Sequence, residues 1–290
     1  MPTPGHPLPG PSDSTTGPSD STTGPSLTAR AHSFNTIAAQ YAANRPSYPP
    51  ALFAAIEEIA GRPFAGARVA DIGAGTGMAT ALLHRRGAEI VAVEPGEGMA
   101  AEFRRAHPGI PLVRGDGNSL PLADSCADFV TYAQAWHWTD PARALPEALR
   151  VLRPGGALAL WWNLDAQDVP WIAEQTDRVR QHYGDAVVAV WGTRGSARTS
   201  ALPAFTAALG AAAADGRTPH CVRELVRWSR RVPLDTHLAN LGSHSVFLVH
   251  GPERSAAFLA EERDHLLRRF PEGVVEEVYD VELLVTTTVS

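Results

Sequence analysis

Several features that would point to particular kinds of protein are scarce in this sequence. Its two cysteines, Cys126 and Cys221, are spaced neither as metal ligands nor as a redox pair, which argues against a disulfide framework and favours a reducing compartment. No apolar run is long enough to span a bilayer, and the first residues resemble neither a secretion signal nor an organelle transit peptide. We therefore expect a cytoplasmic protein with no membrane partner.

Positive charge is also limited, since the formal net charge is −6 at pH 7. The densest basic cluster, Arg223 to Arg231, is interrupted by Glu224 and by apolar residues. Proteins that bind nucleic acid usually carry a continuous basic stripe that faces the phosphate backbone. The sequence therefore predicts no nucleic-acid partner.

The first residues of the chain contain few apolar side chains. A Gly-Pro-Ser-Asp-Ser-Thr-Thr unit at Gly10 repeats at Gly17 and begins again at Gly24. Because little apolar surface offsets the entropy of ordering this stretch, we predict that residues 1–28 form a disordered tail. Residues 29–290 are long enough for one large domain with a sizeable core.

What the sequence does contain is organised around residues 68–77, which predict a buried strand followed by a glycine-rich turn. Gly73, Gly75 and Gly77 allow a sharp turn, and a helix is predicted over Met78–Arg86. Such a strand, loop and helix would direct bare backbone amides and a positive helix end toward a ligand.

The spacing of these glycines differs from that of common nucleotide-binding loops. A dinucleotide fingerprint has a third glycine where this chain has Met78, and no lysine stands nearby to clamp a phosphate. The charge of Asp71 would repel a phosphate and attract a cation. A nicotinamide oxidoreductase is therefore disfavoured, and a positively charged ligand is expected.

The run Asp71-Ile72-Gly73-Ala74-Gly75-Thr76-Gly77 resembles the first motif of class I S-adenosylmethionine-dependent methyltransferases. The cofactor of that family carries a sulfonium and an ammonium group and has no phosphate. The resemblance implies that S-adenosyl-L-methionine is the cofactor and that Asp71, Gly73 and Gly75 help to bind it. A glycine-rich turn with a capping aspartate is the structural alternative.

Residues 34–50 resemble the "Phe-x-x-x-Ala-x-x-Tyr-x-x-x-Arg-Pro-x-Tyr-Pro" opening of the small-molecule branch, which includes trans-aconitate methyltransferase-like proteins. In that branch the matching tyrosine and arginine lie over the methionine part of the cofactor. The resemblance therefore implies that Tyr41 and Arg45 contact the cofactor. An amphipathic packing helix would produce a similar pattern.

A second predicted strand, Glu89–Glu94, ends in an acid some twenty residues after Gly73. A carboxylate has two acceptor oxygens for the two ribose hydroxyls, so Glu94 is the expected ribose ligand unless it is simply a surface acid at a strand end. Met99 matches a family position beside the adenine, although methionine also fills cores.

The run from Gly115 to Val130 is similar to the family's "Gly-Asp-Ala-x-x-Leu-Pro-Phe-x-x-x-x-Phe-Asp-x-Val". The resemblance implies that Asp116 accepts a hydrogen bond from the adenine amino group and that the Gly117 amide lies near a ring nitrogen. A solvated turn aspartate is the alternative for Asp116.

His137 follows the fourth predicted strand within Trp136-His137-Trp138. It is the one titratable side chain that the motif places near the transferred methyl group, so we predict that it accepts a proton from the methyl acceptor. A family structural signature is the alternative. Its neighbours Trp136 and Trp138, together with Trp161 and Trp162, would form an apolar wall.

Alternating strands and helices with continuous apolar runs predict a doubly wound α/β fold. We expect a seven-stranded, mostly parallel Rossmann-like sheet with an antiparallel edge hairpin and ligands at the carboxyl ends of the strands. The resemblance fades after Asn163. Residues 164–222 are expected to form an insertion that covers the acceptor, followed by strands at 223–232 and 274–289 with a helix at 253–270 between them.

The predicted function is methyl transfer from S-adenosylmethionine to oxygen, nitrogen or carbon of a small-molecule acceptor, in specialised metabolism. No metal is expected, and the identity of the acceptor and the oligomeric state are left open. The alternative is a non-methylating protein, such as a cyclase or a binding module, that retains the cofactor as a structural or electrostatic element.

Overall fold

The computed structural model describes residues 44–184, 201–213, 220–244, 247 and 250–287. The predicted tail at 1–28, Tyr41 and most of the 34–50 segment lie outside these residues. Within them, no helix combines the length and the apolar character needed to cross a bilayer.

The described strands form one seven-stranded sheet in the order β3-β2-β1-β4-β5-β7-β6. β1 to β5 run parallel to one another, whereas β7 is antiparallel to both β5 and β6. The predicted fold class is confirmed. The strand bounds are β1 Arg68–Ile72, β2 Glu89–Glu94, β3 Leu112–Arg114, β4 Ala127–Ala133, β5 Leu152–Asp165, β6 His220–Pro233 and β7 Val274–Thr287.

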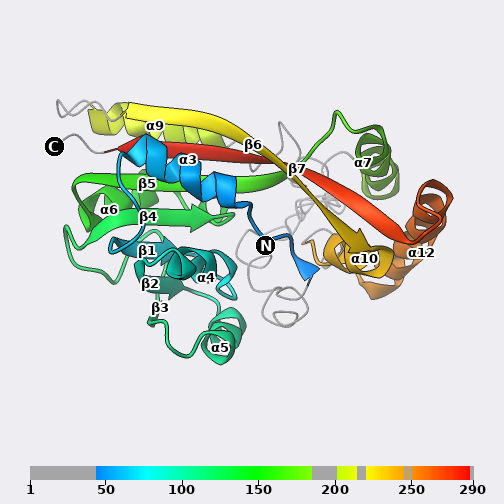
Figure 1. The fold of residues 1–290 in the computed structure, drawn as a ribbon, viewed down its shortest axis with the longest axis horizontal. Helices are drawn as coiled ribbons and strands as arrows, with labels where there is room; N and C mark the ends of the chain where they lie inside the picture. The colour runs from blue at the N-terminus through cyan, green and yellow to red at the C-terminus, as the bar shows by residue number, and fades with distance from the viewer. Residues whose placement is uncertain (1–43, 185–200, 214–219, 245–246, 248–249, 288–290) are drawn as a thin grey trace, which may run out of the picture.

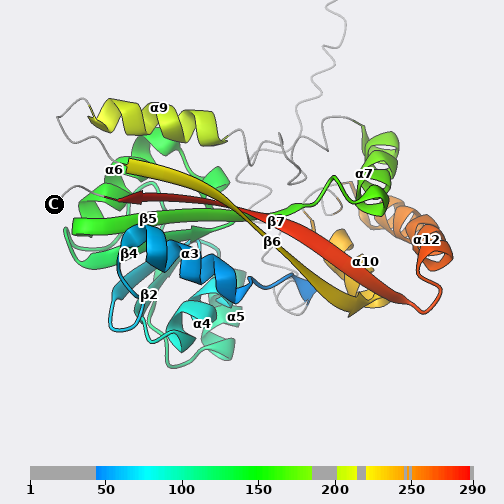
Figure 2. The same ribbon diagram turned by 45° about the horizontal axis from the view of Figure 1, so that its top comes forward.

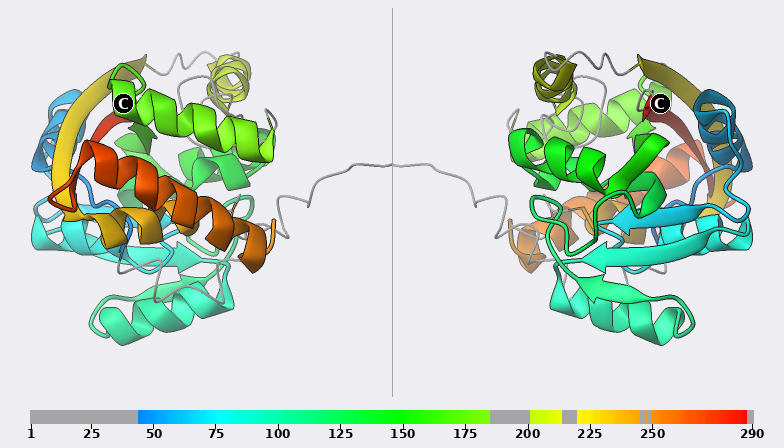
Figure 3. Two further views of the ribbon diagram at one scale, coloured as in Figure 1. Left: turned by 90° about the vertical axis from the view of Figure 1, so that its right-hand side faces the viewer. Right: turned by 90° about the vertical axis from the view of Figure 1, so that its left-hand side faces the viewer.

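Helices cover both faces of the sheet because alternate residues of its strands are apolar on each side. Helices α3 (Pro50–Ala60) and α4 (Met78–Arg85) pack on the face that bears Phe129 and Trp161. Helices α6 (Pro141–Val151) and α9 (Ala201–Ala213) cover the opposite face, and α3 and α9 lie on either side of the sheet in Figure 3. Helix α5 (Glu97–Ala106) packs beside β2 and β3.

β5 begins at Leu152, directly after α6, and runs through Pro154, Gly155 and Gly156. A register shift between β4 and β5 takes up these residues, and Gly155 adopts a positive φ of 71° there.

β6 and β7 continue beyond the parallel strands as a long two-stranded ribbon that ends among three helices (Figure 1). These are α7 (Pro170–Tyr183), α10 (Leu234–Gly242) and α12 (Pro252–Arg269), which bury a separate apolar core. The sequence predicts α12 but not α10. Helix α9 lies over α6 instead (Figure 2), so the described parts of 164–222 separate into two places in the fold.

Candidate functional site

A cavity of about 360 Å³ opens at the carboxyl ends of β1, β2 and β4. Its walls come from the glycine loop, the turn after β2, the turn after β3, the residues that follow β4, and a segment before α3. The lining residues are Arg45, Pro46, Tyr48, Ile72, Gly73, Ala74, Gly75, Thr76, Met78, Ala79, Glu94, Pro95, Gly96, Met99, Asp116, Gly117, Asn118, Tyr132, Ala133, Gln134, Ala135, His137, Trp138 and Thr139.

The glycine loop is held by tight packing and by its own amides. Gly73 has a φ of 67°, and a Cβ added there would lie 2.5 Å from Cβ of Ala135. Its N–H donates to the Val93 carbonyl at 2.8 Å, the Gly75 N–H to Glu94 Oε2 at 2.9 Å, and the Gly77 N–H to the Ala74 carbonyl at 2.9 Å. The prediction that these glycines offer bare amides to a ligand is therefore wrong.

His107, which the sequence did not single out, supports this loop from behind. A Cβ added to Gly77 would lie 2.4 Å from Cδ2 of His107, and the His107 ring is hydrogen-bonded to the backbone of Thr76. The third glycine of the motif is therefore needed for packing against α5 as well as for its φ of 92°.

Asp71 lies beneath the loop and is fully buried, and it does not line the cavity. Thr80 Oγ1 donates to Oδ2 at 2.5 Å, and Thr131 Oγ1 donates to Oδ1 at 2.8 Å. Burial raises the pKa of Asp71 from 3.8 to about 6, while the two hydroxyls oppose that rise. Above that pH the charge can act on a ligand electrostatically, without direct contact.

Glu94 lines the cavity at the end of β2. Its Oε1 accepts from the Gly96 N–H at 2.7 Å, and its Oε2 accepts from Gly75. Burial raises the pKa of Glu94, and these amides and Arg114 work in the opposite direction. Each carboxylate oxygen can accept a further hydrogen bond from a ligand hydroxyl.

The turn after β3 brings Asp116 and Gly117 to the cavity. Asp116 Oδ1 accepts from the Asn118 N–H at 2.9 Å, and Asn118 Oδ1 accepts from the Asp140 N–H at 2.7 Å. A Cβ on Gly117 would lie 3.0 Å from Cγ2 of Thr139. An alanine at this position, as in the related family run, would therefore require Thr139 to move.

Tyr132 contributes a buried hydroxyl that the sequence analysis missed. Its ring is buried in β4, and within the described residues its Oη has no hydrogen-bond partner although the residue lines the cavity. Burial raises the pKa of this hydroxyl, which therefore stays neutral and able to donate. A buried hydroxyl without a partner at a cavity wall fits a polar ligand group there.

His137 also lines the cavity, and Trp162 Nε1 donates to its Nδ1 at 3.3 Å. Because an indole can only donate, the neutral His137 ring in this geometry carries its proton on Nε2. Nearby, Gln134 adopts a left-handed φ of 56°, which is uncommon for a residue with a side chain, and its N–H donates to the Trp161 carbonyl at 2.8 Å.

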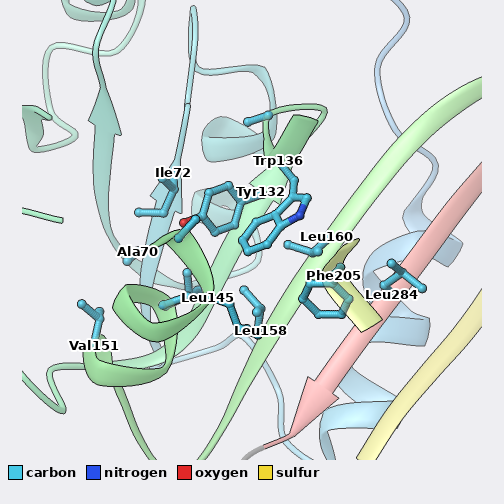
Figure 4. Packing of buried hydrophobic residues seen from close by; sticks show 14 of the residues in the cluster. Ala70, Ile72, Tyr132, Trp136, Leu145, Val151, Leu158, Leu160, Phe205 and Leu284 are labelled. Atoms are coloured by element: carbon cyan, nitrogen blue, oxygen red, sulfur yellow. The ribbon is translucent and has the colours of Figure 1, made fainter. Parts of the chain in front are cut away.

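The four tryptophans do not form the predicted wall. Trp136 is buried between Tyr132 and Phe205 in the core (Figure 4), and Trp161 packs on the opposite face of the sheet. Of the four, Trp138 alone lines the cavity. Trp161 and Trp162 are separated by strand alternation, because neighbouring residues of β5 point to opposite faces of the sheet.

The structure thus brings together most of the residues singled out from the sequence. Those at the cavity are Arg45, Gly73, Gly75, Glu94, Met99, Asp116, Gly117 and His137. Asp71 lies below them, and Tyr41 is outside the described residues. In the described part of the chain, no group of three His, Cys, Asp or Glu side chains is placed to hold a metal ion.

Comparison with known families bears directly on this arrangement. Residues 70–160, which run from β1 into β5, match the family described as "Methyltransferase domain". The chain carries a class I methyltransferase domain. This confirms the resemblance of the glycine motif, and the family implies S-adenosylmethionine as the cofactor. The narrower likeness to the trans-aconitate branch stays a prediction.

Curated relatives support the same assignment for the methyltransferase domain. An uncharacterized methyltransferase of Mycobacterium tuberculosis is 46% identical over 142 residues, which cover 49% of this chain and 56% of the relative. A demethylmenaquinone methyltransferase of Beutenbergia cavernae is 41% identical over 108 residues, covering 37% and 44% of the two chains. The chain spans about half the length of the curated relatives it matches.

Solved structures share the fold over more of the chain. A candidate type II methyltransferase from Anaeromyxobacter dehalogenans aligns with a TM-score of 0.60 at 24% identity, covering 83% of this chain and 97% of that one. The cyclase SpnF aligns with a TM-score of 0.51 at 17% identity, covering 92% and 98%. At these identities the likeness concerns the fold alone.

The residues at the cavity, together with Asp71 beneath it, fit the cofactor that the methyltransferase domain implies. Asp71 and Glu94 provide negative charge that favours a cationic ligand, and Glu94 and Asp116 provide acceptor oxygens for hydroxyl and amino groups. The unpartnered Tyr132 hydroxyl offers a donor.

Proposed function

We propose that this protein transfers the methyl group of S-adenosylmethionine to a small-molecule acceptor. One observation carries the proposal: a single cavity joins the glycine loop, the acid that ends β2, the turn after β3 and the histidine that follows β4. These are four of the places at which the sequence motifs put cofactor and methyl-transfer residues. The match of residues 70–160 to a methyltransferase domain supports it.

When bound, S-adenosylmethionine supplies an activated methyl group on a sulfonium. In our proposal Glu94 accepts from the ribose hydroxyls, Asp116 and Gly117 bind the adenine, and Met99 packs beside it. Arg45 is buried and lines the cavity, and in the same proposal it contacts the methionine part. The chain then mainly positions the reactants and excludes water, which in favourable cases lowers barriers by about 7–11 kcal/mol.

His137 is the proposed contact to the acceptor, which loses one proton when its oxygen, nitrogen or carbon gains a methyl group. In the observed geometry Trp162 occupies Nδ1, so the ring presents an Nε2–H group and orients the acceptor by donating a hydrogen bond. In this role the proton that the acceptor loses passes to water. To act as a base, His137 must first release the indole.

Two variants separate these roles of His137. His137→Ala should lower turnover while the affinity for S-adenosylhomocysteine stays within about threefold, since the change removes an acceptor contact and no cofactor contact. If the indole fixes the donating tautomer of His137, Trp162→Phe should lower turnover as well. If His137 is a base, Trp162→Phe frees Nδ1 and should preserve or raise turnover. Unchanged turnover of His137→Ala at every pH would exclude both roles.

The function itself is tested in two steps on the full chain. Calorimetry should first show binding of S-adenosylmethionine and of S-adenosylhomocysteine. Incubation with methyl-labelled cofactor should then place label on an acceptor and release S-adenosylhomocysteine. Relatives named demethylmenaquinone methyltransferase and malonyl-acyl-carrier-protein O-methyltransferase make demethylmenaquinone and the malonyl carrier protein the first acceptors to test.

The alternative is that the cofactor is retained without methyl transfer. The cyclase SpnF shares the fold, so the fold does not decide between the two chemistries. Binding of both ligands with no S-adenosylhomocysteine formed from any acceptor would favour this alternative. Absence of binding would contradict both functions. The cytoplasmic location and the role in specialised metabolism stay predictions.

A further inference from the structure

One wall of the cavity lies outside the matched methyltransferase domain. It is formed by residues 44–48, which we call the wall segment, and Arg45, Pro46 and Tyr48 from this segment line the cavity. Figure 1 shows this part of the chain running toward α3 beside the ribbon of β6 and β7. The segment is thus a junction between the cofactor site and the carboxyl-terminal half of the protein.

The wall segment has few means of attachment through its own backbone. Pro46 lacks an N–H group, as do Pro49 and Pro50 immediately after the segment, and residues before proline favour extended conformations. Such a segment cannot join a sheet ladder. Its carbonyl oxygens therefore depend on donors from side chains or water.

Side chains from two distant strands supply those donors. Arg230 of β6 donates through Nη2 to the Asn44 carbonyl at 3.0 Å and through Nη1 to the Arg45 carbonyl at 3.3 Å. Asn163 of β5 donates through Nδ2 to the Ser47 carbonyl at 3.1 Å. Three of the carbonyl groups in the wall segment are therefore held by two residues far away in the sequence.

Arg230 is itself held rigidly. Its Nε donates at 2.5 Å to Oε2 of Glu277, which also accepts from the Tyr279 hydroxyl at 2.9 Å, while Oε1 of Glu277 lies 2.7 Å from Nδ1 of His237. Burial favours a neutral Glu277, but His237 and Arg230 outweigh it and lower the pKa to about 2. The guanidinium is thus anchored to a buried anion on β7.

Asn163 lies on β5, but its side chain is held by a residue of the same ribbon. Its Oδ1 accepts from Trp228 Nε1 at 3.0 Å, and the Trp228 ring stacks on Tyr279 with centroids 5.3 Å apart. Both donors to the wall segment are therefore oriented by β6 and β7, which lie beyond the residues that match the methyltransferase domain.

We propose that Arg230 and Asn163 are positioning residues that hold the wall segment against the cofactor, so that the β6–β7 ribbon sets cofactor affinity. This inference rests on the proposed function. The ribbon and its helices carry no residue of the glycine motif, yet they fix the backbone of Arg45 at the cavity.

The role of Arg230 is tested with the variant Arg230→Gln, and Arg223→Gln is its control. Arg223 also lies on β6 and pairs with a buried glutamate of β7, Glu282, but within the described contacts it donates nothing to the wall segment. We expect Arg230→Gln to weaken S-adenosylhomocysteine binding about tenfold in calorimetry, because hydrogen bonds from a charged donor are lost. Arg223→Gln should stay within about twofold. Equal affinities in the two variants would overturn the proposal.

Asn163→Asp provides a second test that does not disturb the ion pair. The variant keeps an oxygen for Trp228 and removes the N–H donor to Ser47. Affinity should fall several-fold, and hydrogen exchange at the Ser47 and Tyr48 amides should accelerate, as it should in Arg230→Gln. Unchanged exchange in both variants would show that these residues do not hold the wall.

Failure of this inference is distinguishable from failure of the proposed function. If the wild-type chain binds no S-adenosylhomocysteine, the proposed function fails, and with it the predicted effect on affinity. If the wild type binds and the exchange rates rise while affinity is unchanged, the wall is held as described but does not set affinity.

Discussion

Asp71 and Tyr132 are both buried at the site, but only the polar group of Asp71 has hydrogen-bond partners among the described residues. Asp71 receives two threonine hydroxyls, whereas the Tyr132 hydroxyl has no hydrogen-bond partner among the described residues. A buried polar group without a partner costs roughly 1–3 kcal/mol of stability. A protein can keep such a destabilising group where a bound ligand provides the missing hydrogen-bond partner.

Tyr132→Phe should therefore stabilise the free protein by about 1 kcal/mol and weaken its binding of S-adenosylhomocysteine. Thermal denaturation with and without ligand measures both effects. The variant without ligand should have a higher melting midpoint than the wild type, and S-adenosylhomocysteine should raise the midpoint of the variant by less. Tyr279→Phe is the matched control, since that buried hydroxyl donates to Glu277 and its removal should destabilise. A lower midpoint for free Tyr132→Phe would contradict the prediction.

Asp71 should make stability and affinity respond to pH in opposite directions. Its folded pKa of about 6 exceeds its ordinary value of 3.8, so its favourable contribution is complete below pH 4 and is lost as the pH rises through 6. The loss amounts to about 3 kcal/mol. Ionisation over the same range should strengthen binding of cationic S-adenosylmethionine.

Asp71→Asn isolates both effects. Relative to the wild type, the unfolding free energy of the variant should increase between pH 4.5 and 7.5, as measured by chemical denaturation at each pH. The rise in S-adenosylmethionine affinity through pH 6 should be absent from the variant. Parallel pH profiles for the two proteins would show that this carboxyl does not titrate as described.

At the scale of an element, the glycine loop shows that similar glycines serve different purposes. Gly73 and Gly75 both have positive φ, but a Cβ on Gly73 would meet Ala135 whereas a Cβ on Gly75 meets nothing within 4 Å. Only one of the two therefore has a packing requirement in addition to a conformational one.

We expect Gly75→Ala to lose about 1–2 kcal/mol of stability from left-handed strain alone. Gly73→Ala should lose more, because the loop must also move away from Ala135. Adding Ala135→Gly to Gly73→Ala should recover the stability that Gly73→Ala loses beyond the loss in Gly75→Ala. A double-mutant cycle, measured by chemical denaturation, tests this. Equal losses in the two single variants would show that the contact with Ala135 is unimportant.

At the scale of the whole molecule, the ribbon joins the sheet to a helical cluster with a polar interior. Glu262 of α12 is buried and accepts from Gln175 at 2.9 Å and from Arg178 at 2.6 and 2.7 Å. These bonds connect α7 to α12 across the apolar core of the cluster. A buried carboxylate with a paired arginine is sensitive to loss of either partner.

Arg178→Ala should destabilise the protein by about 3 kcal/mol, because Glu262 would remain buried without its cation. Arg263→Ala is the control within the same cluster, since Arg263 pairs with Asp235 at the surface and should lose less than about 1 kcal/mol. Chemical denaturation of the two variants and the wild type measures the two losses of unfolding free energy. A smaller loss for Arg178→Ala than for Arg263→Ala would contradict this assignment.

Local sequence patterns were sufficient to predict the parallel half of the sheet and most of the residues at the cavity. Continuous apolar runs, glycine spacing and acids at strand ends are local signals, and parallel strands bring their carboxyl ends to one edge. Glu94, Asp116 and His137 therefore met at the cavity as expected. Thr131 is a polar residue within a buried strand, and a polar side chain in such a place needs a hydrogen-bond partner. This pattern could have indicated that Thr131 pairs with Asp71.

Contacts between residues far apart in the chain could not be predicted from local patterns and were found only in the folded protein. The burial of Asp71, the Gly73–Ala135 contact and the Trp162–His137 hydrogen bond follow from the packing of separate elements. The same holds for the wall segment, which Arg230 reaches across 185 and 186 residues of sequence. No local pattern encodes such a contact, because its energy exists only after the strands have paired.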